Sequence, residues 1–328
     1  MSKQTSRKSR VRQFMGAHAS EISIGSALLV VCILLTFLSP YFLMMRNIKN
    51  VLSYVAIAGV MSAGLTVVML MGCMDLSQYS VMAMIGMFVG KMLQSGLNPL
   101  LAIAAAIIMG GIMGTINGFM VTKMRVVPII ATIGMQLIAR SIAYLSTNGI
   151  YIMVDNPIFY NIGYEEICGL PYLVWALLIV NFTLAFVLSN TSFGRKVYAV
   201  GGNAQACALS GISVTKMRMA GYIISGVTAG IAAVLCTAQV SAAYPTAGNG
   251  QEMDCSAAVY LGGLAVGGGK GSIIGTFIGV TLIAVLLNGM TLLSINAYYQ
   301  VLFKGLVLII AVYIDQVRQM RAPKKVRV

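Results

Sequence analysis

Ionisable side chains are scarce in this 328-residue sequence, and five of them stand in or beside long apolar runs: Asp75, Arg140, Glu252, Asp254 and Lys304. A charge inside a membrane is costly, so such a group marks either a functional pathway or a structural ion pair. Both roles remain open for Asp75 and Arg140. Glu252 and Asp254 follow a Gly-Asn-Gly turn, which favours the solvated edge of a loop.

No arrangement of side chains typical of an enzyme is visible. The single histidine, His18, lies in a basic N-terminal stretch, and only eight residues are acidic. The six cysteines are scattered singly among apolar residues without metal-ligand spacing, which is typical of packing residues. The sequence therefore predicts a protein that is not an enzyme and holds no metal or cofactor of its own.

The glycine-rich stretch at 267–272 invites comparison with a phosphate-binding loop. That motif needs Gly at position 264 and Ser or Thr at position 271. Leu264 and Gly271 occupy these positions. Any active transport must therefore draw its energy from an ion gradient or from ATP bound to a separate subunit.

Composition indicates lipid as the solvent, because 59% of the residues are hydrophobic and 9% are charged, against about 25% charged in soluble domains. A bilayer core needs about 20 apolar residues in helical form. The fold class predicted is therefore all-α and polytopic, with about ten membrane segments and some broken or re-entrant ones. Their expected limits are 24–44, 51–71, 79–95, 99–121, 128–147, 172–189, 218–240, 256–269, 273–293 and 299–315.

The basic residues favour one topology. Most of the 22 cluster in the segments 1–23 and 316–328 or in short loops of the membrane domain 24–315, and an even number of spans places them together. Basic flanks are typical of the cytoplasmic side, so both termini are expected there. Without interleaved aromatic residues, the net charge of +14 indicates contact with membrane lipid and no binding of nucleic acid.

Three segments look more broken than simple spans, at 72–77, 128–132 and 262–271. Irregular backbone at membrane depth is tolerated where protein or a water-filled cavity satisfies it, so these breaks suggest a pathway. The glycines at 110, 111, 114 and 118 have near-helical spacing instead. They favour close packing of two helices.

The longest polar stretch away from the termini lies within 190–218, which this topology places in the cytoplasm. Small residues at 204, 206 and 208, between glycines at 201, 202 and 211, suit a short helix presented to another protein. A plain connector is the alternative.

This stretch resembles the coupling region of permease subunits of ATP-binding cassette importers for monosaccharides, of the ribose and galactose type. FGR at 193–195, YAVGGN at 198–203 and LSGI at 209–212 are similar to that family's motifs. MDLS at 74–77, ING at 116–118, the stretch from Pro128 to Gly134, GGKGS at 268–272 and the last helix agree in order. The resemblance covers nearly the whole chain.

The resemblance implies a permease of about ten helices in a bacterial plasma (inner) membrane. It would pair with a second permease copy or homologue and receive sugar from a periplasmic or lipid-anchored sugar-binding protein. An ATP-binding cassette ATPase subunit would dock on the coupling region and drive alternating access. The residues expected to dock it are Arg195, Gly201, Gly202, Asn203, Ala206, Leu209, Ser210 and Gly211.

Two features depart from the family's pattern. Ala204-Gln205 stands where the family has Pro-Glu, and Ala208 stands where it has Arg. The loss of these two charges indicates a distinct ATPase or a more apolar docking surface. Gln78-Tyr79 replaces a Val-Gly pair and would put bulky polar side chains near a constriction.

A sugar needs hydrogen bonding without charge along its path. The residues expected to line it are Asp75, Ser77, Asn117, Thr132, Gln136 and Asn288. The alternative function is a gradient-driven secondary transporter or channel for a small polar solute. Such a carrier would need ionisable groups in its spans to bind the driving ion.

Overall fold

The computed structural model describes residues 19–321 of the chain. Most of the expected N-terminal segment 1–23 and tail 316–328 therefore lies outside the described residues. Helices dominate the described part, and each of the ten expected apolar segments overlaps one. These helices are α2 (Ala19–Leu38), α3 (Met45–Leu70), α4 (Gln78–Gln94), α5 (Pro99–Thr122), α6 (Pro128–Leu145), α8 (Tyr172–Asn190), α11 (Val214–Gln239), α12 (Glu252–Leu261), α13 (Ile273–Leu292) and α14 (Ala297–Arg321).

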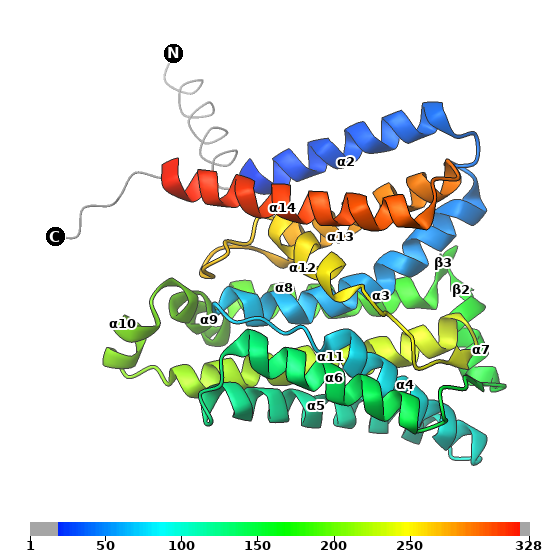
Figure 1. Ribbon diagram of the computed structural model, residues 1–328, viewed down its shortest axis with the longest axis horizontal. Coiled ribbons are helices and arrows are strands. Elements are labelled where there is room, and N and C mark those ends of the chain that lie inside the picture. The colour runs from blue at the N-terminus through cyan, green and yellow to red at the C-terminus, as the bar shows by residue number, and fades with distance from the viewer. Residues whose placement is uncertain (1–18, 322–328) are drawn as a thin grey trace.

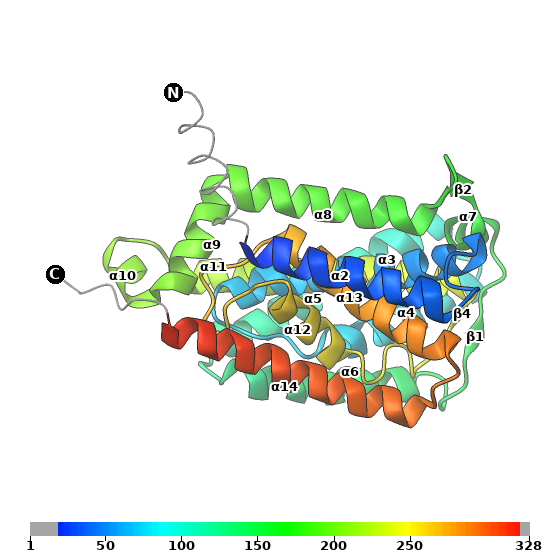
Figure 2. The same cartoon turned by 90° about the horizontal axis from the view of Figure 1, so that it is seen from above.

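The helices form a bundle whose two ends differ (Figures 1 and 2). One end holds α9 (Ser192–Gly202) and α10 (Ala204–Leu209), together with the start of α2 and the end of α14. We call it the α9–α10 end. The opposite end, the α7 end, holds α7 (Pro157–Tyr164) and four short strands, β1 (Ile152–Met153), β2 (Glu166–Ile167), β3 (Leu170–Pro171) and β4 (Ala242–Ala243). The first and last described helices thus share an end, as an even number of passes requires.

Seven helices of the described residues are long and apolar enough to cross a membrane, whereas α4 has 17 residues and α12 has 10. Helices α3 and α11 are mostly buried in the centre of the bundle. Outer helices carry large exposed apolar side chains, such as Phe37 on α2 and Phe182 on α8. A surface of this kind suits lipid, and the fold is that of a polytopic all-α membrane protein.

Helices α5 and α11 approach each other closely through glycine. A Cβ atom at Gly110 would overlap the carbonyl oxygen of Gly226, and one at Gly114 would overlap that of Tyr222. Because no side chain separates the two backbones, the helices pack over much of their length. The prediction that these glycines serve helix packing is confirmed.

We expect Gly110→Ala to lower the free energy of unfolding by about 1–3 kcal/mol, the usual cost of overpacking a tight contact. Gly111→Ala is the matched control, since its Cβ atom would lie 3.6 Å from the Val227 side chain, an ordinary contact. Thermal unfolding of both variants in detergent measures the difference. If the two variants unfolded at the same temperature, the packing of α5 on α11 would not depend on Gly110.

Two of the three expected breaks are present, and they meet at the α9–α10 end. Residues 71–77 separate α3 from α4, and residues 262–272 separate α12 from α13. The backbone N–H of Gly269 donates to the carbonyl of Leu70 at 2.8 Å. Gly72, Gly268 and Gly269 have φ values of 70°, 81° and 73°, a region that glycine enters without steric cost.

The expectation of a break at 128–132 is wrong, because α6 runs without interruption from Pro128 to Leu145. Proline is tolerated at the first helical position, where its missing N–H has no intrahelical partner anyway. The segment expected at 256–269 is also corrected. Its helix, α12, spans Glu252–Leu261, and the glycines that follow it form the turns of the second break.

Candidate functional site

A buried polar network surrounds Asp75 in the first break. The Asp75 carboxylate accepts hydrogen bonds from the Ser77 hydroxyl at 2.6 Å, the Ser77 backbone N–H at 3.1 Å and the Ser225 hydroxyl at 2.6 Å. The short Asp-Leu-Ser sequence folds back on itself, because an Asp side chain readily bonds the backbone two residues on. These bonds hold the break against α11.

Two amides extend this network to neighbouring helices. Gln78 on α4 donates to the Ser225 hydroxyl at 2.7 Å, and Asn117 on α5 donates to the Ser77 hydroxyl at 2.7 Å. The Asn117 Oδ1 atom is buried and has no hydrogen-bond partner among the described residues. The Asp75 network, consisting of Asp75, Ser77, Gln78, Asn117 and Ser225, therefore joins the first break to three helices and leaves one acceptor open.

The residues expected to line a substrate path do not all lie together. Asp75, Ser77 and Asn117 belong to one network, whereas Thr132 is buried on α6 and bonds the Pro128 carbonyl of its own helix. Gln136 is half-buried one turn further along α6. Asn288 on α13 exchanges two amide hydrogen bonds with Asn47 on α3, at 3.0 and 2.8 Å. Asn288 thus clamps two helices away from the Asp75 network.

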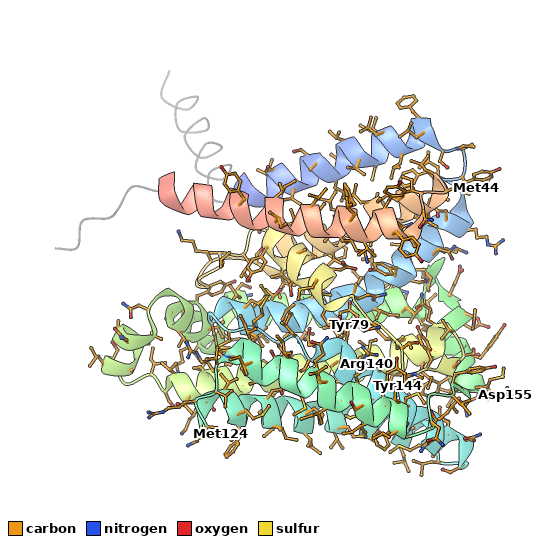
Figure 3. The ribbon with its side chains drawn as sticks, in the orientation of Figure 1. Met44, Tyr79, Met124, Arg140, Tyr144 and Asp155 are labelled. Carbon is orange, nitrogen blue, oxygen red and sulfur yellow. The ribbon has the colours of Figure 1, made fainter. Side chains whose placement is uncertain are left out.

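Two ion pairs fix the short helix α12 to its neighbours. Arg140 on α6 lies 3.6 Å from the Glu252 carboxylate and also donates to the carbonyls of Pro245 and Ala247, at 2.7 and 2.9 Å. Lys304 on α14 lies 2.6 Å from the Asp254 carboxylate. The Arg140 side chain, labelled in Figure 3, is 13% exposed.

The expectation that Glu252 and Asp254 lie at a solvated loop edge is wrong. Their exposed fractions are 6% and 7%. Both belong to the first turn of α12, where the helix dipole favours negative charge, and each has a cationic partner. Arg140 therefore has a structural role, because it holds both a carboxylate and a loop.

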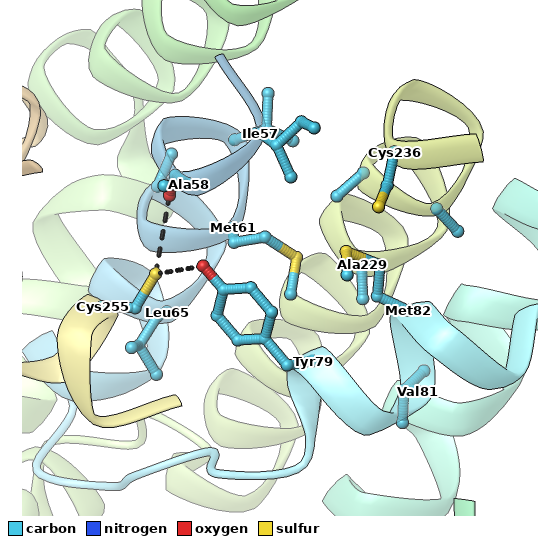
Figure 4. Packing of buried hydrophobic residues seen from close by; sticks show 14 of the residues in the cluster. Ile57, Ala58, Met61, Leu65, Tyr79, Val81, Met82, Ala229, Cys236 and Cys255 are labelled. Carbon is cyan, nitrogen blue, oxygen red and sulfur yellow. Dashed lines mark hydrogen bonds between the residues drawn. The ribbon is translucent and has the colours of Figure 1, made fainter. Parts of the chain in front are cut away.

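The Gln78 and Tyr79 side chains, which differ from the family's pattern, are buried in the bundle. Tyr79 is 2% exposed, and its hydroxyl lies 3.0 Å from the Cys255 sulfur, which also contacts the Ala58 carbonyl (Figure 4). Gln78 is equally buried and bonds Ser225. The two side chains connect α4 to α11 and α12 and fill the core instead of an open constriction.

The stretch expected to dock an ATPase forms two short helices, α9 and α10, where one short helix was expected. Asn203 accepts a hydrogen bond from the Ala206 N–H at 2.9 Å and so caps the start of α10, and Gly211, with a φ of 81°, turns the chain after it. Leu209 is 92% exposed at the tip. An apolar side chain so exposed at a helix end is available for contact with another protein. Arg195, Ala206 and Ser210 are likewise exposed, on α9, α10 and the turn after α10.

Helix α9 packs on the ends of both breaks. A Cβ atom at Gly201 would overlap the Leu70 carbonyl oxygen and the Gly269 nitrogen, whereas one at Gly202 would meet open space. The Tyr198 hydroxyl donates to the Gly271 carbonyl at 3.0 Å. Burial, with the nearby Glu21 carboxylate, raises the pKa of the Tyr198 phenol, so Tyr198 stays a neutral donor. The exposed α10 is thereby joined to the breaks through α9.

The remaining sequence features have simple structural settings. In residues 19–321, no three His, Cys, Asp or Glu side chains gather as metal ligands would. Cys73, Cys207, Cys236 and Cys255 are buried, as packing residues should be, but Cys168 is exposed in the turn between β2 and β3. A Cβ atom at Gly268 would contact the backbone of Gly72 and Leu70, so the 267–272 stretch packs against the first break.

Sequence reasoning missed Ser225 and Tyr222 at this site. Ser225 donates to Asp75, and the Tyr222 hydroxyl donates to the Met74 carbonyl at 3.0 Å. A small polar residue within an apolar helix gives no signal of its own, because it packs as readily as alanine.

The chain resembles known transport proteins over most of its length. Residues 47–312 match the family described as branched-chain amino acid transport system, permease component. The chain is 37% identical to the ribose import permease protein of Escherichia coli (strain K12) over 312 residues, which cover 94% of this chain and 97% of that protein. It is 38% identical to the ribose import permease protein of Bacillus subtilis (strain 168), with 88% and 90% of the two chains covered.

A third relative carries a different sugar in its name. The L-arabinose ABC transporter permease protein of Azospirillum brasilense is 31% identical over 298 residues, with 90% of this chain and 88% of that protein covered. No solved structure matches the chain at a significant level.

Proposed function

This chain belongs to the permease component family of branched-chain amino acid transport systems, and from that membership we propose that it is the membrane-spanning subunit of an ATP-driven importer for a monosaccharide. Its relatives named for ribose and L-arabinose support a sugar as the cargo. The sugar would cross by alternating access between two permease chains, this one and a second copy or a homologue.

ATP would act on a partner subunit. The 267–272 glycine stretch packs on the first break at Gly268, and it lacks the Gly and the Ser or Thr of a phosphate-binding loop at positions 264 and 271. The observation that carries the proposal is the exposure of Leu209, which is 92% accessible at the end of α10. Helix α9, which precedes α10, contacts both breaks. An ATP-binding cassette ATPase would dock on α10, and its movement would pass through α9 to residues 71–77 and 262–272.

The remaining assignments follow from this arrangement. The α9–α10 end would face the cytoplasm of a bacterium, with both termini on that side of the inner membrane, and the α7 end would receive sugar from a periplasmic or lipid-anchored binding protein. Asp75, Ser77 and Asn117, with the open Asn117 acceptor, would contribute neutral hydrogen bonds beside the path. Thr132 and Gln136 would contribute from α6.

The ionisable groups that the structure describes in the spans do not favour the alternative, a gradient-driven carrier. Such a carrier needs ionisable groups that can release their partners. Arg140 and Lys304 are paired with Glu252 and Asp254 at the two sides of α12. Asp75 is held by neutral donors from the surrounding helices. These contacts are those of a fixed scaffold.

Uptake by proteoliposomes tests the proposal. The chain is reconstituted with its candidate ATPase and binding protein, and ribose, arabinose, allose and galactose are offered with and without ATP. We expect uptake of at least one sugar only with ATP and the ATPase present. Uptake driven by this chain alone would refute the proposal.

Leu209→Asp in the same vesicles tests the docking surface. A charge at a contact that buries an apolar anchor typically costs about 2 kcal/mol or more, so uptake should fall roughly 30-fold. Leu145→Asp is the matched control, because Leu145 is 77% exposed at the end of α6. Equal losses in the two variants would remove α10 from the docking surface.

A further inference from the structure

A cavity of about 370 Å³ opens at the α9–α10 end, apart from the Asp75 network and from α10. It lies where α5 ends and where α6 and α11 begin. One part of its lining is apolar and the other is polar and cationic. The residues that matter for its chemistry are Thr122, Arg125, Pro128, Val214, Thr215 and Arg218.

Within residues 19–321, neither arginine of the cavity has a counter-charge. Arg125 is exposed, and Arg218 makes a single long contact, from its guanidinium to the Met71 carbonyl at 3.5 Å. The Nε atom of Arg218 is buried and has no hydrogen-bond partner among residues 19–321. No carboxylate of the described residues forms an ion pair with either side chain. The cavity is therefore a cationic pocket with hydrogen-bond donors that have no partner among the described residues.

Two helix starts add to this positive potential. Helix α6, of 18 residues, begins at Pro128 with no side chain capping its first N–H groups. Helix α11, of 26 residues, begins at Val214, and only one of its first N–H groups, that of Lys216, is capped, by the Ser213 hydroxyl at 3.4 Å. The N-terminal end of a helix carries partial positive charge and unpaired N–H donors. Both helices present that end at the cavity. An anion with several acceptor oxygens would satisfy the arginines and these donors together.

The rim of the cavity is apolar on its outer side. Met124, Val127 and Ile130 are exposed by 61%, 56% and 64% and continue the outer surface of α5 and α6. Figure 3 shows Met124 at the periphery of the bundle, where α5 ends. A ligand that fits both parts has an anionic head and apolar chains, which distinguishes a lipid from a soluble anion.

We propose that this cavity binds the phosphate head group of an anionic phospholipid, with Arg125 and Arg218 contacting the phosphate and the acyl chains lying along α5 and α6. The position suits this ligand, because the ends of membrane helices lie at the depth of the head groups. Neither arginine belongs to the Asp75 network, so sugar uptake and lipid binding can be measured as separate properties.

Titration of the purified full-length chain in a neutral detergent tests the proposal. Phosphatidylglycerol, phosphatidylcholine and inorganic phosphate are added in separate series, and binding is followed by thermophoresis. We expect saturable binding of phosphatidylglycerol only. The pair Arg125→Gln with Arg218→Gln should weaken it about 30-fold, since each cation near an anionic head group contributes about fivefold.

The matched control removes two charges that do not line the cavity, with Lys123→Gln and Lys216→Gln. It should change the affinity less than about threefold, because exposed charges outside the pocket are screened by salt. Arg125→Gln alone, at an exposed position without partners, covers the case in which the double variant fails to fold, and it should cost about fivefold. Equal losses in the control pair, equal binding of phosphatidylcholine, or saturable binding of inorganic phosphate that displaces the lipid would each overturn the proposal.

Discussion

We expect Arg140→Met to lower the free energy of unfolding by about 3–5 kcal/mol, the range found when one partner of a buried ion pair is removed. The substitution leaves the Glu252 carboxylate, 6% exposed, without its cation. It also leaves the carbonyls of Pro245 and Ala247 without their donor. Chemical or thermal unfolding in detergent measures the loss.

A double variant separates the ion pair from simple packing. Replacing Glu252 by Gln in the Arg140→Met background removes the isolated charge and should recover roughly half of the loss. Lys49→Met is the control, since Lys49 and Glu166 form a partly exposed pair of side chains, 36% and 32% accessible. A pair of this kind contributes less than about 1 kcal/mol. The structural role of Arg140 would be contradicted if both single variants unfolded alike.

Gly201→Ala should uncouple ATP hydrolysis from uptake. A methyl group at this position meets the Leu70 carbonyl oxygen and the Gly269 nitrogen, so α9 must move away from both breaks. Overpacking of a tight contact costs about 1–3 kcal/mol. Uptake per ATP hydrolysed should therefore fall roughly tenfold or more, while the ATPase stays active. Reconstituted vesicles allow both rates to be measured together.

Two other glycines make this result specific. Gly202→Ala, in the same helix, should leave the thermal stability unchanged, because its Cβ atom meets nothing within 4 Å. Gly25→Ala on α2 has the same open surroundings and serves as the control for uptake. If the Gly201→Ala and Gly25→Ala proteins transported equally well, the contact of α9 with the breaks would not be needed to couple ATP hydrolysis to uptake.

Hydropathy was enough to locate the long apolar helices, because the demand for about 20 apolar residues acts on each segment separately. Hydropathy failed to place helix ends that depend on contacts with other parts of the chain or on a residue's position within the helix. Pro128 does not break a helix, because it stands at the first position of α6, where proline is tolerated. The glycines after Leu261 end α12 early, and only their fit against Leu70 reveals this.

Part of the site was equally predictable. The Asp-Leu-Ser motif at 75–77 and Asn117 do meet, because polar groups inside an apolar bundle seek each other. Ser225 could not be found, since its partner lies 150 positions away in the chain. The burial of Glu252 and Asp254 was missed for the same reason, because their cations stand on α6 and α14.

The two ion pairs of α12, with Arg140 and with Lys304, affect how the chain enters the bilayer during synthesis. A ten-residue helix that carries two carboxylates has no favourable free energy of insertion by itself, since each acidic group at depth opposes it by about 3 kcal/mol. Arg140 is already in place when α12 emerges from the ribosome, but Lys304 follows 50 residues after Asp254. Residues 252–321, which form α12, α13 and α14, are therefore expected to enter as one cooperative unit in which α14 retains α12.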